Sequence, residues 1–128
     1  MEDDENRDLA AKRIFSMKGI EKYEHTSTGL FVWVKSESQS SKVYMVCLDP
    51  LLKARCECID FLFRGGACKH IRAAVICINW MRESLENNNL PFIKLPSRSE
   101  IEHNINIHKE GNYIALCYNI ILVLYCYN

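Results

Sequence analysis

The spacing of apolar residues predicts one helix before, and one helix after, a stretch rich in strand-forming residues. Residues 6–18 place apolar side chains at positions 10, 14 and 17, an interval that keeps them on one helix face. Asn6 or Asp8 is the expected N-cap of this helix, and Gly19 is its expected end. Residues 71–85 repeat the i, i+3, i+4, i+7 pattern, so we expect this second helix to pack on the strands.

Stretches of β-branched and aromatic residues predict a hairpin between the two helices. Residues 30–34 and 43–48 are the stronger strands, joined by a polar loop over 36–41, and residues 20–25 form a shorter first strand. The hairpin and the helix that follows predict an α+β fold with a small ββα core, preceded by the N-terminal helix. A further apolar group is expected to plug this core: Ile59, Phe61, Leu62 and Phe63.

Residues 87–128 have a less distinct pattern, which predicts a linker and an apolar C-terminal extension. Residues 91–96 are expected to be extended, and residues 97–100 form a capping box that opens a polar helix to about Lys109. Residues 113–127 are almost wholly apolar but fall short of the roughly 20 residues that a membrane helix needs. We therefore expect a strand-like packing tail and no membrane partner, with a tail anchor and a truncated end as open alternatives.

Two short motifs carry the strongest chemical signal in the sequence. Cys56 and Cys58 are separated by one residue, and nine residues later Cys68 and His70 are again separated by one. Three thiols and one imidazole are a standard ligand set for a closed, tetrahedral structural zinc site. The pattern therefore predicts one structural Zn²⁺ bound by Cys56, Cys58, Cys68 and His70.

The motif spacing also predicts the local backbone. An extended C-x-C segment would point its side chains to opposite faces, so Cys56 and Cys58 need a bend that leaves a strand. Gly65 and Gly66 allow the intervening loop to turn the second pair of ligands back onto the first. Cys68 lies at the start of the second helix, where unpaired N–H groups and the helix dipole favour thiolate over thiol. A hairpin and one helix bury little area, so zinc is expected to contribute folding free energy.

Disulfides, inert cysteines and a catalytic Cys/His pair are the alternatives to zinc. The first five residues are acidic, unlike a signal peptide, and in a reducing compartment such paired motifs indicate a metal before a disulfide. A nucleophilic cysteine needs a base and an open substrate position, whereas this cluster uses every member as a ligand. The other cysteines lie in apolar runs, so we expect inert buried thiols, and the other histidines lack ligand spacing. These residues are Cys47, Cys77, Cys117, Cys126, His25, His103 and His108.

Composition and net charge limit the classes of partner that the chain is expected to bind. With 128 residues, 48 % of them hydrophobic and 25 % charged, the chain has the size and composition of one globular domain. Its formal net charge of zero excludes a global basic field of the kind that drives non-specific nucleic-acid binding. Residues 51–75 nevertheless carry five Lys or Arg against two acids, which suits either phosphate contact or neutralisation of a zinc–thiolate site. The five cations are Lys53, Arg55, Arg64, Lys69 and Arg72.

The motif and its surroundings resemble the SWIM-type zinc finger, whose pattern is C-x-C, a variable loop, then C-x-H. The resemblance covers about residues 20–85, and all four ligand positions match. It implies a β-hairpin followed by a helix, with one zinc ion held by the two cysteine motifs. It also implies three segments: an acidic stretch and helix over 1–19, the finger over 20–86, and a linker with an apolar tail over 87–128. The supporting residues are Phe31–Val34, Val43–Leu48, Asp60-Phe61, Gly65-Gly66, Cys68–Ile71 and Ala73-Ala74.

The resemblance implies a binding module and not an enzyme. SWIM fingers look like DNA-binding or protein-binding accessories of Mutator-like transposases, derived plant transcription factors, ubiquitin ligases and recombination mediators. The sequence shows no transposase acidic triad, Walker lysine motif or RING finger, and we expect no small-molecule substrate. We expect a nuclear, intracellular module for DNA or protein contact, as an accessory or fragment of a transposase-derived protein. The alternative is a recombination mediator or ubiquitin-pathway adaptor that contacts protein and never DNA.

Overall fold

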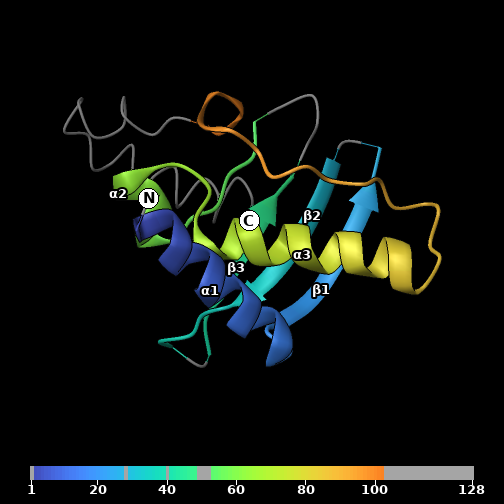
Figure 1. The fold of residues 1–128 in the computed structure, drawn as a ribbon, viewed down its shortest axis with the longest axis horizontal. Coiled ribbons are helices and arrows are strands. Elements are labelled where there is room, and N and C mark those ends of the chain that lie inside the picture. Colours follow the sequence, from blue (N-terminus) through green and yellow to red (C-terminus); the bar gives the residue numbers. More distant parts are fainter. Residues whose placement is uncertain (1, 28, 40, 49–52, 103–128) are drawn as a thin grey trace.

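The computed structural model describes residues 2–27, 29–39, 41–48 and 53–102. Its elements are α1 (Glu2–Ser16), β1 (Ile20–Thr26), β2 (Gly29–Lys35), β3 (Val43–Cys47), α2 (Ile59–Arg64), α3 (Lys69–Ser84) and the 3₁₀ turn η1 (Arg98–Glu100). The strands form an antiparallel sheet in the order β1-β2-β3. Figure 1 shows α1 and α3 side by side, with α3 crossing the sheet. The predicted α+β class is confirmed.

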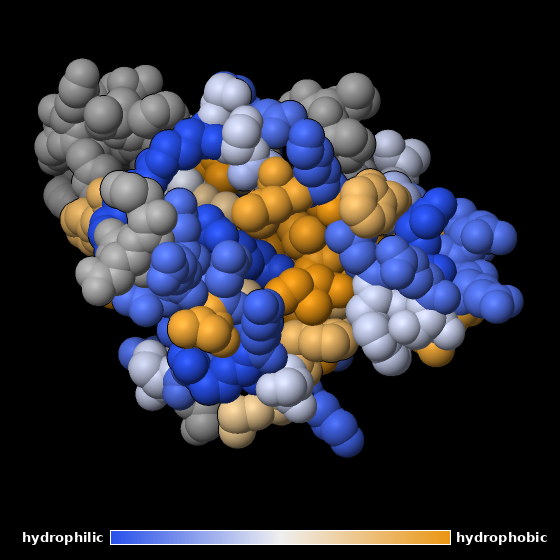
Figure 2. All heavy atoms as spheres, viewed as in Figure 1, coloured by the Kyte–Doolittle hydropathy of each residue, from blue (hydrophilic) through white to orange (hydrophobic). Residues whose placement is uncertain are grey.

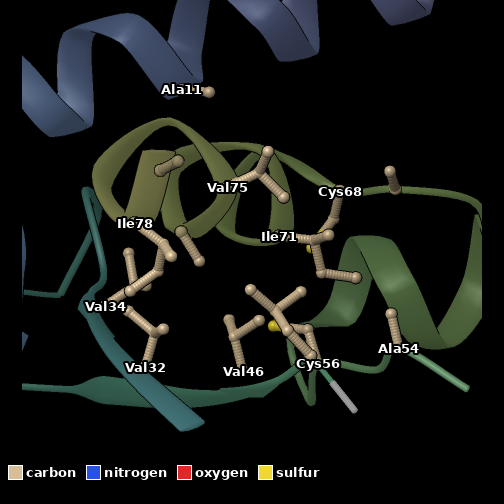
Figure 3. Packing of buried hydrophobic residues seen from close by; sticks show 14 of the residues in the cluster. Ala11, Val32, Val34, Val46, Ala54, Cys56, Cys68, Ile71, Val75 and Ile78 are labelled. Atoms are coloured by element: carbon tan, nitrogen blue, oxygen red, sulfur yellow. The ribbon is translucent and has the colours of Figure 1, made fainter. Parts of the chain in front are cut away.

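The core lies between α3 and the sheet, as the sequence pattern predicted. Val32 on β2 pairs with Val46 on β3, and both side chains are fully buried. Figure 3 shows Ile71 and Ile78 of α3 facing Val34 and Val46 of the sheet. The predicted short first strand is present as β1, an edge strand that is exposed along most of its length. The ββα core therefore gains a third strand.

α1 begins earlier than the sequence pattern predicted. It starts at Glu2, so neither Asn6 nor Asp8 is its N-cap. Asp8 instead accepts a hydrogen bond from Nη1 of Arg72 at 2.7 Å, which uses the carboxylate in a contact between α1 and α3. Met17, which was expected on the buried stripe, lies beyond the end of the helix and is 74 % exposed.

Gly19 ends α1 as predicted, because the backbone approaches the helix closely there. Its N–H donates to the carbonyl of Ile14 at 2.8 Å, after Lys18 has adopted a positive φ of 58°. A Cβ on Gly19 would lie 2.6 Å from Cγ2 of Ile14, a distance that side chains do not tolerate. The carbonyl of Gly19 then accepts from the N–H of Lys35, which fixes the end of α1 beside the sheet.

α2 was not predicted from the sequence, and it changes the expected core plug. Phe61 is 1 % exposed, whereas Ile59 and Phe63 are 69 % and 65 % exposed. Ile59 and Phe63 are four residues apart and therefore share the outer face of this short helix. Only Phe61, with half-buried Leu62 beside it, supplies the apolar plug.

The segment after α3 is extended over 91–96, as predicted, and is held against that helix. Nδ2 of Asn79 donates to the carbonyl of Ile93, and the N–H of Ile93 donates to Oδ1 of Asn79, both at 2.7 Å. Nε of Arg82 donates to the carbonyl of Leu90 at 3.0 Å. These hydrogen bonds hold residues 90–93 against α3.

The predicted capping box is present, but the helix it opens is a single turn. The N–H of Ser97 donates to Oε1 of Glu100 at 3.0 Å, and η1 follows. Ile101 is already extended, at φ −110° and ψ 138°, because it bridges to Ala54 beside the zinc motif. The expected helix therefore does not continue at Ile101, and the rest of that prediction, toward Lys109, lies outside the described residues.

Several predictions concern residues beyond those that the structure describes: His103, His108, Cys117, Cys126 and the apolar tail at 113–127. Among the described residues, Cys47 and Cys77 are buried thiols as expected, and His25 is exposed. No helix in this part of the chain is long and apolar enough to cross a membrane.

Candidate metal centre

The first pair of predicted ligands lies in a bend between β3 and α2. Arg55 pairs with Cys47 in an isolated antiparallel bridge, so the chain is still extended as it approaches Cys56. It then turns, and Cys58 becomes the N-cap of α2, where its Sγ accepts a hydrogen bond from the N–H of Phe61 at 3.4 Å. The predicted bend is present, and α2 provides it because the helix starts immediately after Cys58.

The second pair lies at the start of α3, which two glycines allow. Gly65 and Gly66 have φ values of 69° and 73°, a left-handed conformation that glycine adopts without strain. This turn leads to Cys68, the N-cap of α3, and places His70 in the first turn of the helix. The ring of Tyr44 on β3 packs against His70 with the ring centroids 4.8 Å apart, which restricts the plane of the imidazole.

The structure brings all four predicted ligands together. Their candidate ligand atoms lie within 4.8 Å of one another, and all four residues are buried. Nδ1 of His70 is 3.8 Å from Sγ of Cys56 and 4.0 Å from Sγ of Cys68. Ligands at the usual Zn–S and Zn–N distances stand about 3.5–3.8 Å apart in a tetrahedron, so a small contraction fits this set to zinc.

The protonation of the three thiols also fits a dication. Burial raises the pKa of Cys56 well above its ordinary value and raises the pKa of Cys68 to about 12. The pKa of Cys58 is lowered, chiefly because Cys56 and Cys68 hydrogen-bond to its sulfur. Burial thus disfavours the charged form of Cys56 and Cys68. A bound cation would release their protons and so bind more weakly at low pH.

Two buried polar atoms border the cluster. Nδ1 of His70 faces the sulfur atoms, while Nε2 is buried with no hydrogen-bond partner among the described residues. Oε2 of Glu57, the residue between the first two cysteines, is likewise buried with no partner in this part of the chain. Burial raises the pKa of the Glu57 carboxyl group. The motif pattern gives Glu57 no role beyond spacing the two cysteines.

The comparisons with known proteins agree with this geometry. Residues 46–79, which run from β3 into α3 and include the whole cluster, match the family model of the SWIM zinc finger. The chain carries a SWIM zinc finger. The match is narrower than the 20–85 expected from the resemblance, since it leaves out β1 and β2. The SWIM finger and its Cys₃His cluster together indicate one structural zinc ion. Neither the curated proteins nor the solved structures yield a match to the chain.

Most of the basic residues around the SWIM finger are paired with acidic side chains. Four of the five cations of residues 51–75 form ion pairs, and Lys53 is exposed. Paired cations of this kind are less available for phosphate contact or for offsetting thiolate charge. The pairs are Arg55 with Glu102, Arg64 with Asp60, Lys69 with Glu37, and Arg72 with both Asp4 and Asp8.

Glu37 is a positioning residue that the sequence analysis missed. Its carboxylate accepts hydrogen bonds from Arg13 of α1, at 2.6 and 3.1 Å, and from Lys69 at 2.8 Å. Lys69 lies between Cys68 and His70, so Glu37 ties the second ligand pair to α1. The only sequence signal was one acid in a serine-rich loop, and a loop position does not reveal contacts with distant residues.

Replacing Glu37 by glutamine is expected to lower stability at neutral pH. Hydrogen bonds from Arg13, and then from Lys69, lower the pKa of Glu37 to about 2. The carboxylate therefore stabilises the fold fully above its ordinary pKa of 4.5, and this contribution disappears as the pH falls toward 2. Arg13 is half exposed, so solvent screening limits the loss to on the order of 1 kcal/mol.

Thermal melting of zinc-loaded wild type and Glu37→Gln at pH 7 checks this expectation. The melting temperature of the variant should be about 4 °C lower. The control is Glu24→Gln, because Glu24 is an exposed carboxylate on β1. Equal melting temperatures for the three proteins at pH 7 would show that Glu37 does not position the ligands.

Proposed function

We propose that this chain is a zinc-stabilised interaction module, with Cys56, Cys58, Cys68 and His70 as the four ligands of one zinc ion. The observation that carries the proposal is the clustering of four buried N and S ligand atoms within 4.8 Å, inside the segment matched by the SWIM family. A site that uses four protein ligands leaves no position for a substrate. The module therefore acts by binding and not by catalysis.

Protein is the preferred partner on grounds of charge and exposed apolar surface. The formal net charge is zero, and the cations nearest the zinc site are paired with acids, which favours protein over a polyanion. Ile59 and Phe63 expose most of their side chains on α2, next to the ligands. Apolar side chains displayed beside a rigid site are common in protein interfaces.

DNA is the second candidate partner, favoured by the excess of positive charge over residues 51–75 and by exposed Lys53. Under this alternative the module is an accessory or fragment of a transposase-derived protein in the nucleus. Under the preferred proposal, a recombination mediator and a ubiquitin-pathway adaptor are both compatible with the module. The origin and the compartment stay predictions.

Titration of zinc-loaded protein with a labelled DNA duplex at several salt concentrations separates the two candidates. We expect weak binding that depends little on salt. A protein that neutralises 6–10 phosphates loses about 10³–10⁵-fold in affinity between 50 and 200 mM salt, so a fall of that size would overturn the preference for protein. In that case Lys53→Gln should reduce the salt slope by about 1. Lys69 and Arg72 are unsuitable for this test because their ion pairs support the fold.

A further inference from the structure

A partly enclosed cavity of about 260 Å³ lies where α1, the glycine turn and the segment after α3 meet. Its walls include the side chains of Arg7, Arg72 and Arg98, together with Asp4. Three guanidinium groups from three separate segments converge on this small space. No motif in the sequence indicates a role for Arg7 or Arg98.

Arg7 presents one unused donor to the cavity. Its side chain is 6 % exposed and is held by Asp60, which accepts from Nε at 2.9 Å, and by the carbonyl of Gly65, which accepts from Nη2 at 2.9 Å. Nη1 donates no hydrogen bond to any described residue and lies 3.1 Å from where a Cβ on Gly66 would be. This donor is held in place and borders the cavity, so it is available to an acceptor that enters from outside the chain.

The side chain of Arg98 lies close to the same position. Its Nη2 lies 3.0 Å from the same Cβ position on Gly66, while Nη1 makes only a long contact of 3.4 Å to the carbonyl of Arg64. The free donors of Arg7 and Arg98 are therefore at most about 6 Å apart. Asp60 offsets the charge of Arg7, whereas Arg98 has no acidic partner among the described residues, so an anion placed here would interact most strongly with Arg98.

We propose that this cavity binds a single carboxylate of a protein partner, between Nη1 of Arg7 and Nη2 of Arg98. Guanidinium groups form strong paired hydrogen bonds with carboxylates. Leu95 and Pro96 also line the cavity and can pack against the methylene groups of a glutamate side chain. The proposal rests on the proposed function, because it names the chemistry by which that module recognises protein.

The rim of the cavity favours a single charge over a polyanion. Asp4 lines the cavity, with its side chain 51 % exposed, and its carboxylate accepts from Arg72. A negative group at the opening repels a doubly charged phosphate or a row of DNA phosphates more than it repels one carboxylate. Gly66 forms part of the wall and belongs to the turn that joins the two pairs of zinc ligands. Loss of zinc should therefore also remove this site.

NMR titration of the zinc-loaded full chain with acetyl-glutamate amide tests the proposal. The readouts are the backbone amide signal of Gly66 in every protein and, where arginine is retained, the Nε–H signal of Arg98, with chloride at matched ionic strength as the baseline. We expect a saturable shift in wild type, loss of that shift in Arg98→Gln, and at least fivefold weaker binding in Arg98→Lys because lysine lacks the planar fork. Lys94→Gln is the matched control, because Lys94 is an exposed cation outside the cavity.

The possible outcomes separate this proposal from the broader one. Absence of a saturable shift in wild type, or equal binding in Arg98→Gln and Lys94→Gln, would overturn the carboxylate site and leave the zinc module intact. Tighter binding of inorganic phosphate than of acetyl-glutamate amide would overturn the choice of carboxylate. Shifts of the same signals by a DNA duplex, with a steep salt dependence, would overturn the protein partner as well. Unchanged melting temperature and zinc content in Arg98→Gln would establish that lost binding is not lost folding.

Discussion

Cys58→Ser will lack bound zinc and will lose its cooperative thermal transition at pH 7. Cys58 is one of the four clustered ligands and is also the N-cap of α2, so its replacement affects both the metal and the helix that carries Phe61. Structural zinc supplies about 10–16 kcal/mol of apparent folding free energy in zinc-finger peptides. Domains are stable by only about 5–15 kcal/mol, so losing the metal removes most or all of the net stability.

Elemental analysis combined with circular dichroism checks this expectation, and a chelator should produce the same spectrum from wild type. The matched control is Cys77→Ala. This substitution also removes a buried thiol, but Cys77 lies on α3 and outside the ligand cluster. This variant should keep one zinc per chain and lose about 1 kcal/mol. If Cys58→Ser binds zinc at the wild-type ratio and melts at the wild-type temperature, the ligand assignment is wrong.

Phe61→Ala will destabilise the protein by about 3–5 kcal/mol, the cost of deleting a buried aromatic side chain and leaving a cavity. Phe61 is 1 % exposed and is one of the largest fully buried side chains. It packs in the same cluster as Cys56 and Cys58, so the cavity would open directly beside the metal ligands. Weaker zinc retention against a chelator should therefore accompany the loss of stability.

Phe63→Ala provides the comparison, because it deletes the same side chain two residues further along α2. Phe63 is 65 % exposed, so its loss should cost less than about 0.5 kcal/mol. Urea denaturation of the two zinc-loaded variants measures both values. Similar losses of unfolding free energy in the two variants would show that α2 is not docked through Phe61.

The clustering of the four candidate metal ligands was predictable because their chemistry depends on residue type and short spacing. Cys56, Cys58, Cys68 and His70 form two compact motifs, and few structures other than a metal site bring three thiols and an imidazole together. The strands were equally predictable, since the β-branched residues of β2 and β3 carry their preference locally. The sequence thus contained the elements of the finger and its chemistry.

Contacts between distant residues were not predictable in the same way. Arg72 meets Asp8 across 64 positions of sequence, and no local pattern distinguishes these charges from solvated ones. The start of α1 was misplaced for this reason, because Asp8 appeared to be a free capping residue. α2 was missed because its six residues are too few for a helical period to appear.

The ion pairs between α1 and the finger determine which fragment of the chain could carry the finger in a fusion protein. Arg72 is buried, and its partners Asp4 and Asp8 lie well outside the matched residues 46–79. A fragment cut at those boundaries would keep all four candidate ligands and yet lose α1, which supplies the acids that pair with Arg72 and two side chains of the core, Ala11 and Ile14. The smallest portable unit therefore begins with the N-terminal helix, and fusion proteins meant to carry the finger should start at residue 2 and not at residue 46.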